Sequence, residues 1–173
     1  MHQSKVNKKS DMIHLIVGNT GAGKSTYANS LKSDNNGIIF TLDKWNKVLF
    51  FADKTENDGL DWFLERIERA ETLMQDLILQ LESSKVDSIL DVGLSKYSHR
   101  EKYRKFALDN NLEVKIHFLD IPKKIRKERV LKRNLEKGKT FEFEVSENDF
   151  EFMEKWFEKP TKSELENAIV IKE

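Results

Sequence analysis

Short apolar segments recur along the chain and are separated by longer stretches in which apolar residues have helical spacing. A short apolar segment bounded by turn-forming residues is typical of a strand buried in a sheet. Five segments have this pattern: 12–17 (MIHLIV), 37–43 (GIIFTLD), 86–94 (VDSILDVGL), 113–121 (EVKIHFLDI) and 167–172 (NAIVIK).

Helices are predicted between these strands. The clearest is 60–81, where apolar residues recur every three or four positions, and shorter helices are expected over 24–31 and around 100–110. Strands that alternate with helices form a parallel sheet with helices on both faces. We therefore predict a single α/β domain over residues 11–173, preceded by a flexible basic tail at residues 1–10.

Composition narrows the class of protein. The 30 basic and 30 acidic residues cancel, so no net field indicates a nucleic-acid or membrane partner. The absence of cysteine excludes disulfides and thiolate metal sites. Apolar runs of about five residues are far too short to cross a bilayer. We expect a cytoplasmic protein with no membrane or nucleic-acid partner, and we favour a monomer without fixing the oligomeric state.

Three of the seven glycines lie within six residues, in GNTGAGKST at 18–26. This segment matches the phosphate-binding pattern G-x-x-x-x-G-K-[ST] and lies between a predicted strand and a predicted helix, as that pattern requires. Backbone amides and the helix N-terminus would hold the phosphates of ATP, Lys24 would reach the β- and γ-phosphates, and Ser25 would contact Mg²⁺. The predicted nucleotide-binding residues are Gly18, Asn19, Thr20, Gly21, Ala22, Gly23, Lys24, Ser25 and Thr26.

The remaining sequence favours one class of nucleotide enzyme. No N/T-K-x-D segment of a GTPase follows a later strand, and no LSGGQ signature of a transport ATPase occurs. A chain of 173 residues leaves little room for a motor or for the added helical domain of a ring ATPase. A small P-loop kinase fits best, with the phosphoryl acceptor beside the loop.

Two aspartates end predicted strands, Asp43 after IIFTL and Asp91 after SIL. Ligands of open parallel sheets bind at the carboxyl ends of the strands, so both carboxylates are expected to face the loop. One would hold Mg²⁺ and the other would accept the proton of the attacking hydroxyl. We assign Asp91 to the metal and Asp43 to the proton, although spacing alone allows the roles to be exchanged, and either side chain could instead cap the following helix.

A basic segment, KKIRKERVLKRN at 123–134, places Arg126, Arg129 and Arg133 on one face of a predicted helix. Guanidinium groups neutralise a transferring phosphoryl group better than ammonium groups do. We predict that this helix belongs to a lid, at about 123–150, that closes over the nucleotide. The alternative is a solvated basic face.

The order of these segments resembles a group of P-loop kinases that includes zeta toxins, polynucleotide kinases and chloramphenicol phosphotransferase. The likeness is closest to an uncharacterised bacterial branch of ATP-binding proteins. It is carried by GNTGAGKST, TLDKW, LERIERAE, ILDVGLSKYSHREKYR, FLDIP, KERVLKRN and FEKPTKSE, which cover the chain from residue 13 to about 165.

This resemblance implies a five-stranded sheet in the order 2-3-1-4-5, Asp43 as the base, and Arg129 and Arg133 as catalytic lid arginines. It also implies that Arg66, Arg69 and Arg100 contact the acceptor or its phosphate, although Arg66 and Arg69 have neighbouring glutamates with which they can pair. The aromatic segment 44–63 would form the acceptor wall, where Trp45 either stacks on the substrate or packs into the core. Residues after Asp43 depart from the pattern of polynucleotide kinases, so the acceptor stays open.

The sequence thus favours a kinase that transfers the γ-phosphoryl group of MgATP to a hydroxyl of a small-molecule or nucleotide acceptor. The alternative is a nucleotide-binding switch or slow ATPase that acts through a partner protein. A candidate base and an arginine helix favour the kinase, because a switch needs neither.

Overall fold

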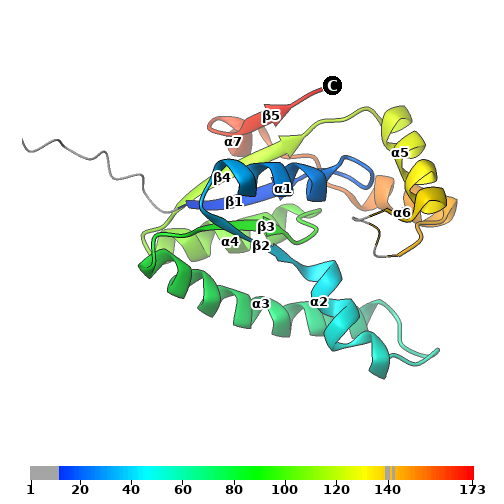
Figure 1. The fold of residues 1–173 in the computed structure, drawn as a ribbon, viewed down its shortest axis with the longest axis horizontal. Helices are drawn as coiled ribbons and strands as arrows, with labels where there is room; N and C mark the ends of the chain where they lie inside the picture. The colour runs from blue at the N-terminus through cyan, green and yellow to red at the C-terminus, as the bar shows by residue number, and fades with distance from the viewer. Residues whose placement is uncertain (1–11, 139–140, 142) are drawn as a thin grey trace, which may run out of the picture.

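The computed structural model describes residues 12–138, 141 and 143–173, and the chain forms a parallel α/β sheet (Figure 1). The strand order is β2-β3-β1-β4-β5, and all neighbouring strands are parallel. The predicted sheet order 2-3-1-4-5 is therefore confirmed. The strands are β1 (Met12–Val17), β2 (Gly37–Thr41), β3 (Asp87–Asp91), β4 (Glu113–Leu119) and β5 (Ile169–Ile171).

The predicted tail at 1–10 lies outside the described residues, and so do 139, 140 and 142 of the predicted lid region. Among the described helices, none is both long enough and apolar enough to cross a membrane.

The sheet has an apolar core on each face. All five residues of β3 are buried, and β1 is buried from Ile13 to Val17. Strands covered on both faces need mostly apolar side chains at successive positions, which is why these segments contain short apolar runs such as residues 15–17 and 89–90. The sequence pattern therefore located the interior strands well.

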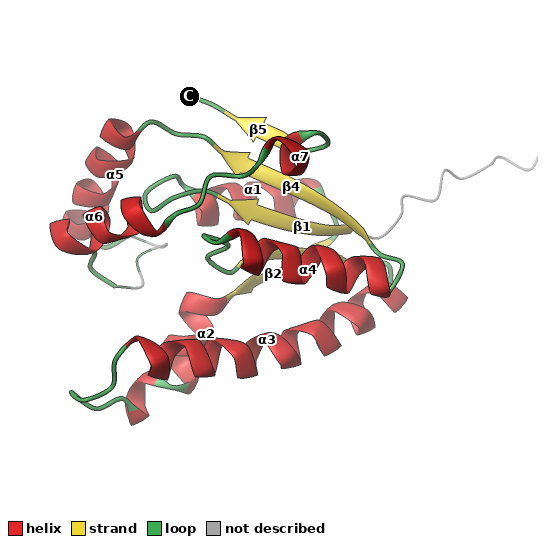
Figure 2. Cartoon of the chain, turned by 180° about the vertical axis from the view of Figure 1, so that it is seen from behind, coloured by secondary structure: helices red, strands yellow, loops and turns green. Residues whose placement is uncertain are grey.

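Helices cover both faces and give the predicted three layers (Figures 1 and 2). Helix α1 (Lys24–Asp34) packs on one face, where Ala28 meets Ile16 and Ile89 in one apolar cluster. Helices α3 (Leu60–Ser83) and α4 (Tyr97–Asp109) pack on the other face. Their contributions to the second cluster include Met74, Ile78, Tyr103 and Ala107.

Element boundaries differ from the predicted ones near the site. Strand β2 ends at Thr41, and helix α2 (Leu42–Leu49) follows at once, then a short 3₁₀ turn, η1 (Phe51–Asp53). Asp43 was predicted to end this strand, but it lies in the first turn of α2. Strand β3 ends at Asp91 rather than at 94, and Gly93 takes a positive φ of 79° in the loop that follows.

Helices α5 (Lys123–Glu136) and α6 (Glu147–Trp156) lie together at the carboxyl ends of the strands (Figure 1). Val130 of α5, Phe150 of α6 and Val145 form a separate apolar cluster. The sequence pattern did not predict α6 or the short α7 (Lys162–Leu165). Both begin with a capping box, at Ser146/Asp149 and Thr161/Glu164, and this signal was present in the sequence.

Candidate active site at the carboxyl ends of the strands

The glycine-rich loop joins β1 to α1 and has a backbone path that side chains would block. Gly21 has a φ of 81°, and a Cβ atom there would lie 2.4 Å from the carbonyl oxygen of Arg126. Gly23 has a φ of 91° and occupies the N-cap position of α1, where no side chain caps the helix. The first amides of α1 are therefore left to bind an anion, as expected for a phosphate-binding loop.

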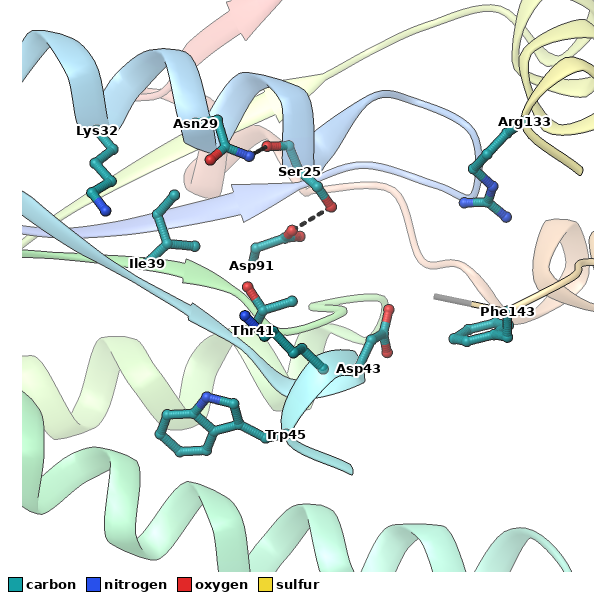
Figure 3. Close-up of a pocket in the computed structure, with 11 residues that line it drawn as sticks. Ser25, Asn29, Lys32, Ile39, Thr41, Asp43, Trp45, Asp91, Arg133 and Phe143 are labelled. Carbon is teal, nitrogen blue, oxygen red and sulfur yellow. Dashed lines mark hydrogen bonds between the residues drawn. The ribbon is translucent and has the colours of Figure 1, made fainter. Parts of the chain in front are cut away.

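Ser25 and Asp91 are brought together at the base of this loop. The hydroxyl of Ser25 donates a hydrogen bond of 2.6 Å to Oδ2 of Asp91, across 66 residues of sequence (Figure 3). Asp91 is 7% exposed and ends the fully buried strand β3, so its carboxylate is held firmly beside the hydroxyl. The two residues predicted to serve the metal are thus direct neighbours.

Lys24 shares this environment. Burial lowers the pKa of its ammonium group, and the carboxylates of Asp91 and Asp43 act in the opposite direction. The ammonium group of Lys24 therefore interacts electrostatically with both carboxylates. Bound phosphates would add further negative charge and favour the protonated form.

Asp43 is exposed and lies at the start of α2, opposite Arg133 across the opening beside Ser25 and Asp91 (Figure 3). Arg133 of α5 is half-buried, and its Nε and Nη2 atoms are buried without a hydrogen-bond partner among the described residues. Burial lowers the pKa of the Arg133 guanidinium, and the Asp43 carboxylate opposes that effect. A buried donor without an acceptor lowers the stability of the folded protein, and an anion bound at this guanidinium would supply the missing acceptors.

Arg129 lies closer to the loop itself. Its Nη1 donates to the carbonyl of Ala22 at 3.3 Å, and its Nη2 pairs with Glu173 at 2.6 Å. Arg126, on the same face of α5, is buried and pairs with Glu154 of α6 at 2.5 and 3.0 Å. It also donates to the carbonyl of Thr20, so it joins both helices to the loop.

Glu154 was not singled out from the sequence. Besides pairing with Arg126, its carboxylate accepts a 2.5 Å hydrogen bond from the side-chain amide of Asn19 in the loop. The amide nitrogen of Asn19 thus binds α6, while its Oδ1 accepts a hydrogen bond of 2.7 Å from the backbone N–H of Thr20. The sequence contained no local signal for this contact, because its partners lie 135 residues apart.

The arginines that resemblance assigned to the acceptor lie elsewhere. Arg100 is fully buried and donates two hydrogen bonds to the carboxylate of Glu164. Its Nη1 donates to the backbone carbonyls of Leu94 and Glu158. All of its nitrogen atoms are engaged, so Arg100 cannot contact a substrate in this structure. Arg66 stacks on Trp62 and Arg69 pairs with Glu65, and neither lines a cavity at the site.

Two cavities adjoin at the carboxyl ends of the strands. The larger, about 970 Å³, lies over the glycine-rich loop between residues 20 and 27, with Arg129 and Phe152 on its far side. The smaller, about 390 Å³, is lined by residues of α1, β2 and α2, among them Trp45. Both cavities share Ser25, Asp43, Asp91, Arg133 and Phe143.

The smaller cavity includes residues that the sequence reading missed. Asn29 and Lys32 follow Ser25 at four and seven positions, so all three lie on one face of α1. That periodicity was visible in the sequence. Phe143 has no comparable signal, because it lies in the loop between α5 and α6.

The residues at the junction fit a magnesium ion bound together with a nucleotide. A hydroxyl and one carboxylate are suitable ligands for Mg²⁺, which in phosphoryl-transfer sites takes its other ligands from phosphates and water. Within the part of the chain that the structure describes, no three His, Asp or Glu side chains form a metal cluster of their own. A metal held here therefore fits one that arrives with the phosphates.

The chain is similar to known proteins over most of its length. The sequence profile of a family described as AAA domain matches residues 13–160. No curated protein sequence matches the chain.

Solved structures share the fold at low sequence identity. A putative kinase from Chloroflexus aurantiacus superposes with a TM-score of 0.69 at 14% identity, covering 94% of this chain and 85% of its own. Kti12 from Chaetomium thermophilum, in complex with ADP-AlF3, superposes with a TM-score of 0.66 at 13% identity, covering 92% of this chain and 88% of its own. The APS kinase CysC from Mycobacterium tuberculosis, in complex with AMPPNP and APS, superposes with a TM-score of 0.61 at 15% identity, covering 94% of this chain and 88% of its own.

These likenesses agree with the sheet order, the loop geometry and the resemblance to P-loop kinases, which is thereby confirmed. Since the family match extends over most of the chain, the protein belongs to the AAA domain family and has the fold of a nucleotide-binding P-loop kinase.

Proposed function

We propose that the protein is a kinase that transfers the γ-phosphoryl group of ATP to a hydroxyl of a small-molecule or nucleotide acceptor. The observation that carries this proposal is the junction of two cavities at Ser25, Asp43, Asp91 and Arg133. The larger cavity contains the phosphate-binding loop and suits ATP. The smaller cavity gives a second compound access to the same residues, and a simple ATPase has no need of it.

Each residue of the junction has a role in this reaction. The loop amides and Lys24 bind the phosphates of ATP. Ser25 and Asp91 would hold Mg²⁺, which supplies neutralisation of the phosphate charge. Arg133 offers two unpartnered buried donors to the oxygens of the transferring group. Arg129 lies over the start of α1 and would bind the phosphates after it leaves Glu173.

Asp43 is the proposed base. The acceptor oxygen attacks the γ-phosphorus, and its proton passes to the Asp43 carboxylate. The bond between the γ-phosphorus and the bridging oxygen breaks, and ADP leaves with that electron pair. Asp43 suits this role because it is exposed at the junction, whereas Asp91 is buried and engaged by Ser25. This contrast favours one of the two assignments that the sequence left open.

The named relatives support both candidate functions. The APS kinase structure contains a nucleotide analogue together with APS, which agrees with two adjoining ligand sites. The Kti12 structure is a complex with ADP-AlF3, and its name does not describe a kinase, so a nucleotide-binding switch or slow ATPase acting through a partner protein is the second candidate. We favour the kinase because of the smaller cavity, and we propose that it works as a cytoplasmic monomer.

The test is ADP release from ATP in the presence of pooled hydroxyl-bearing metabolites. A kinase releases ADP only when a pool contains its acceptor. In the Asp43→Asn variant, acceptor-dependent turnover should fall by about 10² to 10⁴, the usual worth of a general base. ATP affinity measured by calorimetry should stay near that of the wild type, because the phosphate contacts do not involve Asp43.

Asp53→Asn is the matched control, since Asp53 is exposed in η1 and lines neither cavity. It should leave turnover unchanged. Turnover that no pool stimulates, and that Asp43→Asn does not reduce, would instead establish the switch or slow ATPase.

A further inference from the structure

The smaller cavity carries more positive charge than the proposed transfer of a phosphoryl group requires. Lys32 of α1 and Lys44 of α2 both line it, and neither lines the larger cavity over the loop. Among the described residues, neither lysine has a hydrogen-bond or ion-pair partner. In Figure 3, Lys32 extends from α1 on the side of Ser25 away from Arg133.

The phosphates of ATP do not account for these lysines. The nucleotide side already has Lys24, Arg129 and the amides of the loop, and Arg133 lies at the junction. On the acidic side, Asp91 accepts the hydrogen bond from Ser25 and is assigned to the metal, which leaves Asp43 as the base. Binding of the nucleotide and the metal, and proton transfer to the base, therefore leave Lys32 and Lys44 without an assigned role.

We propose that the acceptor is a small hydroxyl compound that already carries a phosphate group, and that Lys32 and Lys44 bind this phosphate. The inference rests on the proposed kinase function and names its substrate class. Lysine ammonium groups bind phosphate as point charges that need no fixed geometry, which suits two side chains on different helices.

The dimensions of the site favour a small acceptor over a nucleic acid. A volume of about 390 Å³ lies near the lower end of small-molecule pockets. The chain is neutral overall, with 30 basic and 30 acidic residues, so no net positive charge favours a polynucleotide as the acceptor. With the phosphate on Lys32 and Lys44, the hydroxyl of a short acceptor would point along the cavity toward Asp43.

Binding is tested first, with inorganic phosphate as the probe. The protein is saturated with Mg-AMPPNP so that the γ-phosphate position is filled, and phosphate is titrated at constant ionic strength. The readout is the indole N–H signal of Trp45 in a ¹H–¹⁵N spectrum, since Trp45 lines the smaller cavity and the other two tryptophans do not. Phosphate should shift this signal saturably.

Lys32→Gln and Lys44→Gln should each weaken phosphate binding by about fivefold to tenfold, and the double variant should abolish it. Lys105→Gln is the control, because Lys105 is an exposed lysine of α4 outside both cavities. No saturable shift of Trp45, or equal weakening by all three single substitutions, would overturn the phosphate site.

Turnover then identifies the acceptor class. ADP release is compared for glycerol and glycerol 3-phosphate, ribose and ribose 5-phosphate, and adenosine and AMP. The phosphorylated member of at least one pair should be preferred, and Lys44→Gln should raise its KM. Preference for neutral members, or for the 5′-hydroxyl of an oligonucleotide, would contradict the proposal.

Failure of the proposed function is recognised separately. If Mg-AMPPNP does not bind, the kinase proposal is wrong. The phosphate titration, repeated with the Lys24→Ala variant to weaken the anion site of the loop, still decides whether Lys32 and Lys44 bind phosphate.

Discussion

At the scale of single residues, the loop shows why its glycines have different roles. Gly21 and Gly23 both have a positive φ, but only Gly21 faces backbone at short range. The nearest atom to a Cβ on Gly23 would be Nη1 of Arg129 at 3.7 Å, an ordinary contact. Gly21 therefore sets how closely α5 approaches the loop, whereas Gly23 sets the direction in which α1 begins.

Gly21→Ala should destabilise the protein more than Gly93→Ala. The two glycines have nearly equal φ values, 81° and 79°, so both substitutions carry the same left-handed strain of about 1–2 kcal/mol. Only at Gly21 would the new methyl group meet backbone, at 2.4 Å, while nothing lies within 4 Å at Gly93. We expect about 1–3 kcal/mol of additional loss for Gly21→Ala.

Urea unfolding of the two variants measures this difference, and calorimetry with ATP reports on the loop itself. Gly21→Ala should also weaken ATP binding. Equal unfolding midpoints for the two variants would show that α5 moves to accommodate the methyl group without loss of stability.

The same scale shows which site residues the sequence could reveal. Ser25 and Asp91 were paired from motif and strand end alone, because a parallel sheet brings the ends of its strands to one edge. Arg100 was misread, since nothing near it in the sequence shows that Glu164 would neutralise it from 64 residues away. Long-range pairing of buried charges has no local pattern.

At the scale of elements, helix α5 presents its arginines to different partners. Arg126 holds α6, Arg129 contacts the loop and Glu173, and Arg133 keeps two buried nitrogens without partners in the described structure. One helix face thus combines a structural residue with two residues that can bind phosphate. The i, i+3, i+7 spacing predicted the shared face but not this division.

Arg133→Lys should weaken the binding of ADP–aluminium fluoride, a mimic of the transferring phosphoryl group, by about 10². Lysine keeps the charge but loses the planar set of donors. Affinity for ADP alone should change little, because ADP lacks the group that Arg133 contacts. Calorimetric titration with each ligand separates the two effects without knowledge of the acceptor.

Arg104→Lys, on the surface of α4, is the control and should bind both ligands as the wild type does. An equal loss of affinity for ADP and for ADP–aluminium fluoride in Arg133→Lys would remove Arg133 from the transition state.

Helices α4 and α7 are joined by the buried pair of Arg100 and Glu164, with side chains fully buried and atoms 2.6 Å apart. The same guanidinium binds the carbonyl of Leu94, which orders the loop between β3 and α4 beside the site. Glu164→Ala should cost about 3–5 kcal/mol, because it leaves a buried charge unpaired.

Chemical denaturation measures this loss, with Glu166→Ala as a control on the exposed side of the same segment. Glu166→Ala should stay within about 0.5 kcal/mol of the wild type. The double variant Arg100→Met/Glu164→Leu should recover much of the stability, since no charge is then buried. No recovery would mean that Arg100 acts mainly through the carbonyls of Leu94 and Glu158.

At the scale of the whole molecule, the sheet is the part that the sequence predicted best and the lid region the part it predicted least. Strands buried on both faces are mostly apolar, so their pattern can be recognised without knowledge of the packing. Helix α6 has a capping box in its sequence, but its position depends on contacts such as Glu154 with Arg126, which local patterns do not encode. The site draws on both parts, which is why the pairing of Ser25 with Asp91 was predicted and several residues lining the smaller cavity were not.

The core of the sheet also contains a polar cluster, from which we expect the stability of the molecule to depend on pH. Nδ1 of His14 lies 2.9 Å from Nε2 of His117, and the hydroxyl of Tyr27 lies 2.8 Å from Nδ1 of His117. Nε2 of His14 faces Asp87 at 3.4 Å. Burial lowers the pKa of His117 to about 4, and His14 and Lys115 contribute to the shift.

The unfolded chain protonates this histidine near pH 6.5, whereas the folded protein resists protonation until about pH 4. The unfolded state therefore binds more protons between these values, and stability should fall by up to about 3 kcal/mol as the pH drops from 6.5 to 4.

Urea midpoints measured from pH 7 to pH 4.5 should decrease steadily in the wild type. His117→Gln should flatten that decrease, even if the variant is less stable at pH 7. Lys105→Gln, which alters an exposed lysine of α4 outside the cluster, should keep it. An unchanged slope in His117→Gln would assign the pH dependence to groups other than the histidine pair.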